Sequence, residues 1–137
     1  MVEEKMRHLE MIQSIITRMA TNSFMLKGWT ITLIVGIFAL ATKDANSIYF
    51  LIAYIPIMLF WVLDSYYLQL ERKYRKLYEK IGKQADADLT FTLQTPSSCR
   101  AQKTSYLQSL LSVTECCFYM SFVVLVTVVW VISWVIL

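Results

Sequence analysis

Apolar residues in this chain are concentrated in three long runs, separated by one very short and one long polar segment. The runs cover residues 23–42, 48–64 and 118–137. A helix needs about 20 predominantly apolar residues to cross a bilayer, so each run is predicted to be a transmembrane helix. The polar connection at 43–47 has room only for a tight turn, and the first two spans should therefore form an antiparallel hairpin.

The second run continues without a breaker into a charged segment, residues 65–82, that keeps a helical pattern. Its apolar and aromatic positions recur at intervals of three and four residues; they are Tyr67, Leu70, Tyr74, Leu77 and Ile81. Oppositely charged residues four apart, Glu71 with Arg75 and Glu79 with Lys83, add slight support to a solvated helix. We predict one long helix whose second half forms a stalk in water, ending near Gly82.

Residues 1–22 show a second amphipathic pattern, with apolar positions at Leu9, Ile12, Ile16 and Met19. The apolar face of this helix could lie on the membrane surface or against the stalk. We favour the stalk, because acids and bases are mixed on the polar face, whereas interfacial anchors are typically rich in lysine.

The long polar segment, residues 83–102, is the least periodic part of the chain. Within it Leu89, Phe91 and Leu93 alternate with polar residues, which is the pattern of a short strand. A lone strand could pair with other copies of the chain, bind the edge of a partner, or lie extended over the stalk. From residue 103 the sequence again favours helix, and a single helix over 103–137 is expected to run from the stalk into the third span.

Composition fixes the class of protein. Hydrophobic residues make up 57% of the 137 residues, which leaves too little polar sequence for the surface of a soluble globular domain. We expect an all-α membrane protein with three transmembrane helices, a cytoplasmic helical stalk and an N-terminal amphipathic helix.

Placement of the basic residues predicts the orientation of the spans. The segment between the second and third spans carries Arg72, Lys73, Arg75, Lys76, Lys80, Lys83, Arg100 and Lys103, whereas the first loop carries only Lys43. By the positive-inside rule, the N-terminus and residues 65–112 should be cytoplasmic and the C-terminus outside.

Three ionisable residues should lie at a similar depth near the cytoplasmic edge of the membrane. Lys27 opens the first span, Asp64 closes the second and Glu115 opens the third. Such residues are costly in lipid and normally pair or face water. They could form a structural bridge from Lys27 to one of the acids, snorkel to the interface without partners, or line an ion-conducting ring. We favour the bridge.

Two further features of the spans have ordinary structural explanations. Gly28, Thr32 and Gly36 recur every four residues, a pattern of small residues that lets another helix approach closely. Pro56 removes a backbone donor within the second span and could kink it.

No catalytic, cofactor-binding or metal-binding set is evident. The chain has one histidine, His8, and its cysteines, Cys99, Cys116 and Cys117, have neither metal-ligand nor disulfide spacing. The basic stalk is better explained by membrane topology than by nucleic-acid binding. We therefore expect a protein that is not an enzyme and that binds lipid and copies of itself.

Two stretches carry a family resemblance: residues 18–29, RMATNSFMLKGW, before the hairpin, and residues 64–75, DSYYLQLERKYR, after it. In this layout, over residues 11–81, the chain resembles the small SLATT-like membrane effectors of bacterial conflict systems. The resemblance implies assembly into pores in the bacterial inner membrane when a partner sensor is triggered. Because no sensor domain is evident here, a separate cytosolic protein would supply the trigger.

These observations leave three hypotheses. The first is an oligomeric, pore-forming effector of the inner membrane. The second is a membrane-anchored scaffold that holds a cytosolic partner and does not conduct. The third is a holin-like protein, which ranks last because holins commonly end in a basic cytoplasmic tail.

Overall fold

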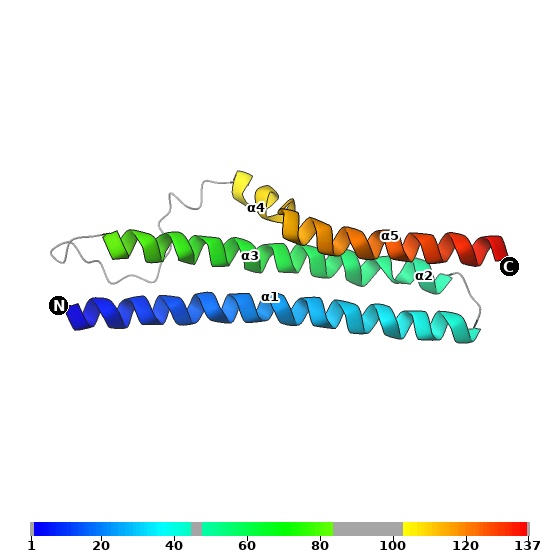
Figure 1. Cartoon of the computed structure of the whole chain (residues 1–137), viewed down its shortest axis with the longest axis horizontal. Coiled ribbons are helices and arrows are strands. Elements are labelled where there is room, and N and C mark those ends of the chain that lie inside the picture. The colour runs from blue at the N-terminus through cyan, green and yellow to red at the C-terminus, as the bar shows by residue number, and fades with distance from the viewer. Residues whose placement is uncertain (1, 45–47, 84–102, 137) are drawn as a thin grey trace.

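The protein is almost entirely helical in a computed structural model that describes residues 2–44, 48–83 and 103–136. Its elements are α1 (Val2–Asp44), α2 (Ile48–Ile52), α3 (Tyr54–Lys83), α4 (Lys103–Leu110) and α5 (Val113–Ile136). In Figure 1, α1 and α3 are long neighbours, and α5 runs beside the part of α3 that adjoins α2. No strand occurs among these described residues.

In the described ranges, three helices are long and apolar enough to cross a membrane: α1, the α2–α3 pair taken together, and α5. The prediction of an all-helical chain with three helices able to cross a membrane is confirmed. The spans coincide with the three apolar runs because a helix satisfies every backbone donor and acceptor within its own segment, as lipid requires.

The first helix is continuous from Val2 to Asp44, so the predicted N-terminal helix (1–22) and first span (23–42) are one element. No proline interrupts this stretch. Its two glycines, Gly28 and Gly36, are both helical.

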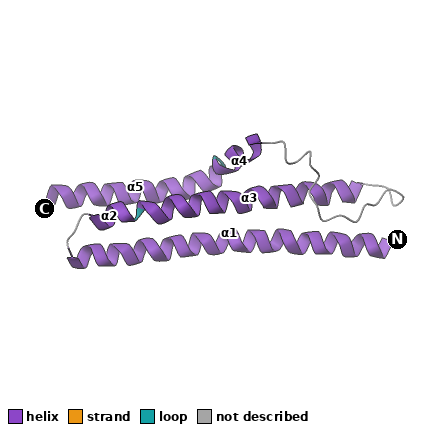
Figure 2. Ribbon diagram, turned by 180° about the vertical axis from the view of Figure 1, so that it is seen from behind, coloured by secondary structure: helices purple, strands orange, loops and turns teal. Residues whose placement is uncertain are grey.

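The second span is interrupted at Ala53, between α2 and α3. Pro56 explains the position of the break: it has no N–H to offer the carbonyl of Ile52, and its ring crowds that carbonyl. The preceding bond, from Ala53 N to Tyr49 O at 3.2 Å, is still made. The two pieces therefore continue in nearly the same direction (Figure 2).

The single helix expected over 103–137 is wrong, because the chain breaks at Leu111 and Ser112 into α4 and α5. Ser112 N bonds Ser109 O at 3.2 Å, a tightened last turn, and Ser112 O accepts the N–H of Cys116 at 2.8 Å, the first bond of α5. Ser112 is thus the N-cap residue of α5. The change of direction between α4 and α5 is visible in Figure 2.

Two separate apolar cores hold the helices together. The membrane core joins all three spans and consists of Ile34, Ala53, Ile57, Tyr119 and Val126. The stalk core joins the first half of α1 to the end of α3 and consists of Ile12, Ile16, Leu77 and Ile81, with Leu9 and Tyr74 packed against it.

The stalk core contains part of the apolar stripe predicted for residues 65–82. Tyr74, Leu77 and Ile81 face the first half of α1, whereas Tyr67 and Leu70 are half-buried nearer the membrane core. Leu9, Ile12 and Ile16 of α1 thus pack against the end of α3. The predicted strand at Leu89, Phe91 and Leu93 lies outside the described residues.

Candidate functional site

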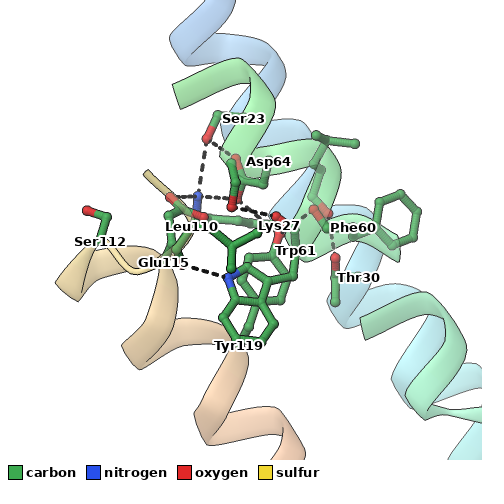
Figure 3. A network of polar contacts seen from close by, with 12 residues as sticks. Ser23, Lys27, Thr30, Phe60, Trp61, Asp64, Leu110, Ser112, Glu115 and Tyr119 are labelled. Carbon is green, nitrogen blue, oxygen red and sulfur yellow. Dashed lines mark hydrogen bonds and ion pairs between the residues drawn. The ribbon is translucent and has the colours of Figure 1, made fainter. Parts of the chain in front are cut away.

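The three ionisable residues of the spans meet in one buried cluster (Figure 3). Lys27 comes from α1, Asp64 from α3 and Glu115 from the first turn of α5. Lys27 Nζ lies 2.5 Å from Asp64 Oδ2 and 2.9 Å from Glu115 Oε1. One ammonium group therefore bridges two carboxyl groups and ties all three spans together.

Lys27 uses its full donor capacity. An ammonium group has three donors, and here the third partner is Ser23 Oγ, one turn earlier on α1, at 3.1 Å. The ring of Phe118 lies 5.8 Å from Nζ, within the range of a cation–π contact. The lysine side chain is 19% exposed, so the pair is shielded from solvent on most sides.

Asp64 is completely buried and well satisfied. Its Oδ1 accepts a hydrogen bond from Ser23 Oγ. Its Oδ2 accepts from Lys27 and from the hydroxyl of Tyr119, the latter at 3.0 Å. Three donors on one carboxylate offset the large cost of removing its charge from water.

Glu115 is equally buried, at 3% exposed, but far less satisfied. Only Oε1 is bonded, to Lys27. Within the described part of the chain, its Oε2 is buried and has no hydrogen-bond partner. The two acids of the cluster are thus unequal, although both contact the same lysine.

A ring of surrounding contacts fixes α5 against α3. Tyr119 stacks on Trp61 with ring centroids 6.2 Å apart, and Trp61 Nε1 donates to Leu110 O at 3.2 Å. Arg72 reaches across from α3 and donates to Ser109 Oγ at 3.4 Å and to Ser112 Oγ at 3.2 Å. These bonds hold the junction of α4 and α5 and so set the depth of Glu115.

The expected bridge is present, with one difference: Lys27 contacts both acids rather than one. Sequence reasoning missed Ser23 and Tyr119. Both carry a signal that could have found them, because Ser23 is four residues before Lys27 and Tyr119 four after Glu115, which places each on the same helix face. The capping pattern Ser112-x-x-Glu115 was missed as well.

The small-residue face of α1 points away from the other helices. Gly28, Thr32 and Gly36 are all exposed, and a Cβ added at either glycine would meet nothing within 4 Å. The Thr32 hydroxyl is satisfied locally by the carbonyl of Gly28 at 3.0 Å. The helix contact predicted for this face is not made within the chain and stays a prediction for contacts between copies.

Among the described residues, no three His, Cys, Asp or Glu side chains are grouped closely enough to hold a metal ion. Cys116 and Cys117 are free thiols. Comparisons with models of protein families, with curated proteins and with solved structures gave no match. The interpretation of the cluster therefore depends on its own geometry.

Proposed function

We propose that this protein is a pore-forming membrane effector that acts as an assembly of identical copies. The interior of one chain cannot serve as the pore: Ile34, Ile57 and Val126 pack between the spans, and the charge cluster closes the end of this core. The conducting path of the proposed pore lies between copies.

The observation that carries this proposal is the contrast between two features of α1, its lysine and its face of small residues. Lys27 faces inward and is fully engaged, whereas the face of Gly28, Thr32 and Gly36 is exposed along two turns of a transmembrane helix. Small residues on an exposed helix face let a second helix approach closely, and van der Waals packing drives helix association in lipid.

Large apolar side chains around this face are also exposed, among them Trp29, Val35 and Leu40. They can face lipid in a single copy and pack against a neighbour in the assembly. The cluster then has a structural role, which is to keep each three-helix unit intact.

The positive-inside rule supports a topology with the N-terminus and residues 65–112 in the bacterial cytoplasm and the C-terminus outside. The stalk would then project toward a separate cytosolic sensor protein. Its exposed residues, including Arg75, Lys76 and Lys80, offer a charged surface for such a partner. This arrangement agrees with the SLATT-like layout of the sequence.

Ion or dye flux from vesicles tests the proposal. Purified protein at increasing protein-to-lipid ratio should release a small entrapped dye with a steeper than linear dependence on ratio, because several copies are needed for each pore. Gly28→Leu should lower the release, and Val128→Leu, a change at an exposed position of α5, should not. Absence of release from oligomeric wild-type protein, alone and with its sensor, would refute the pore.

A scaffold is the second candidate, favoured by the stalk itself. The stalk core of Ile12, Ile16, Leu77 and Ile81 holds two helices together well beyond the charge cluster and makes a rigid platform. Under this alternative, vesicles stay sealed while the stalk still captures its cytosolic partner.

A further inference from the structure

The charge cluster contains one more acid than base. Lys27 supplies one positive charge from α1, and Asp64 of α3 and Glu115 of α5 supply two carboxyl groups. The nearest other cation that the described contacts place beside α5 is Arg72, and its guanidinium is directed to Ser109 and Ser112. Tyr119 contributes a neutral hydroxyl and Ser23 another.

With both acids ionised, the cluster would carry a net negative charge in a region shielded from water. An uncompensated buried charge costs several kcal/mol in practice, and such groups normally bind a proton instead. A neutral cluster needs one proton on one of the two acids.

Hydrogen bonding indicates which acid carries it. Asp64 accepts from three donors, an arrangement that stabilises a carboxylate. Among the described residues Glu115 accepts from Lys27 alone, and its buried Oε2 receives no hydrogen bond. Both carboxyl groups are held against the same ammonium nitrogen, at 2.5 Å for Asp64 Oδ2 and 2.9 Å for Glu115 Oε1. Two negative charges held so close together disfavour ionisation of both groups, and the acid with fewer hydrogen-bond donors takes the proton.

We propose that Glu115 is a proton-binding site and carries a proton while the three spans are packed together. The proton comes from water and lies on Oε2 of Glu115, the oxygen that accepts no hydrogen bond among the described residues. Protonated Glu115 still accepts from Lys27 through Oε1, so the lysine bridge is kept and the cluster is neutral.

Loss of this proton would place a second negative charge beside Asp64 in an apolar surrounding. Because α5 is linked to the rest of the membrane core through Tyr119, Val126 and this cluster, repulsion between the acids acts directly on the attachment of α5. Glu115 thus couples proton binding to the packing of the third span. The inference does not depend on whether assembled copies conduct.

Infrared spectroscopy of the protein in lipid vesicles tests the site. Protein with ¹³C-labelled glutamate side chains should show, at neutral pH, the carbonyl stretch of one protonated glutamic acid. The isotope shift separates this band from any aspartic acid. Glu115→Gln should abolish the band, and Glu79→Gln, a change at an exposed stalk residue, should leave it unchanged.

Asp64→Asn gives a second, opposite expectation. With Asp64 neutral, Lys27 faces a single carboxyl group, Glu115 ionises to balance it, and the band should disappear although Glu115 is still present. Wild-type protein with an intact helical fold and no protonated glutamate at neutral pH would overturn the proposal. This measurement uses the wild-type protein alone, so misfolding of a variant cannot obscure its result.

Discussion

Lys27 and Glu115 are 88 residues apart in the sequence, yet the ammonium nitrogen of the first lies 2.9 Å from a carboxyl oxygen of the second. This contact joins the first span to the third. With Asp64 on the other side of the same nitrogen, it makes Lys27 the point at which all three spans are connected.

Replacing Lys27 with methionine should destabilise the packed bundle by about 3 to 5 kcal/mol, the usual cost of leaving a buried charge without its partner. Methionine keeps most of the apolar length of the side chain, so the change isolates the lost charge. Denaturation in mixed detergent micelles, followed by circular dichroism, measures the difference. Lys76→Met, at an exposed stalk position, is the matched control and should change stability little.

The same pair can be tested by exchanging its charges. Lys27→Asp combined with Asp64→Lys restores an ion pair between α1 and α3 and should recover part of the stability lost in either single variant. If the loss of stability in the double variant equals the sum of the losses in the two single variants, the ion pair does not stabilise the bundle.

Removing the hydroxyl of Tyr119 should weaken the cluster while sparing the membrane core. Tyr119→Phe keeps the ring that stacks on Trp61 but deletes the 3.0 Å hydrogen bond to Asp64. Hydrogen bonds to charged groups contribute about 1.5 to 3 kcal/mol, and a loss of that size is expected in the same denaturation assay. Tyr66→Phe, at an exposed aromatic, should have almost no effect; equal losses in the two variants would argue against a role for the Tyr119 hydroxyl.

Enlarging the small face of α1 should separate assembly from folding. In Gly28→Leu and Gly36→Leu the added Cβ meets no atom of the described residues within 4 Å, so the three-helix unit should fold and denature as in the wild type. Close approach of a second copy would be blocked, and the mass of the protein in mild detergent, measured by mass photometry, should fall toward that of one chain.

Val128→Leu serves as the control for this experiment, because it enlarges an exposed side chain on a different span, α5. Gly28→Leu and Gly36→Leu proteins that keep the wild-type mass would exclude this face as the contact between copies.

Local pattern was sufficient to find the apolar spans. The apolar runs correctly predicted three helices able to cross a membrane, and Pro56 indicated where the second span is disturbed. The break at Leu111 and Ser112 was not anticipated, although the Ser112-x-x-Glu115 capping pattern is typical of a helix start. Apolar periodicity on both sides of the junction concealed it.

The number of apolar spans and their charged residues could be predicted from sequence alone, because hydropathy is a sum over neighbouring residues and needs no knowledge of other segments. The packed helices were needed to show that one lysine bonds two acids, that Asp64 takes most of the donors, and that Gly28 and Gly36 face outward. Those outcomes depend on how each helix is rotated and how deep it sits relative to the others. Rotation and depth are set by packing among Ile34, Ile57, Tyr119 and Val126, residues from three separate parts of the chain that no local pattern brings together.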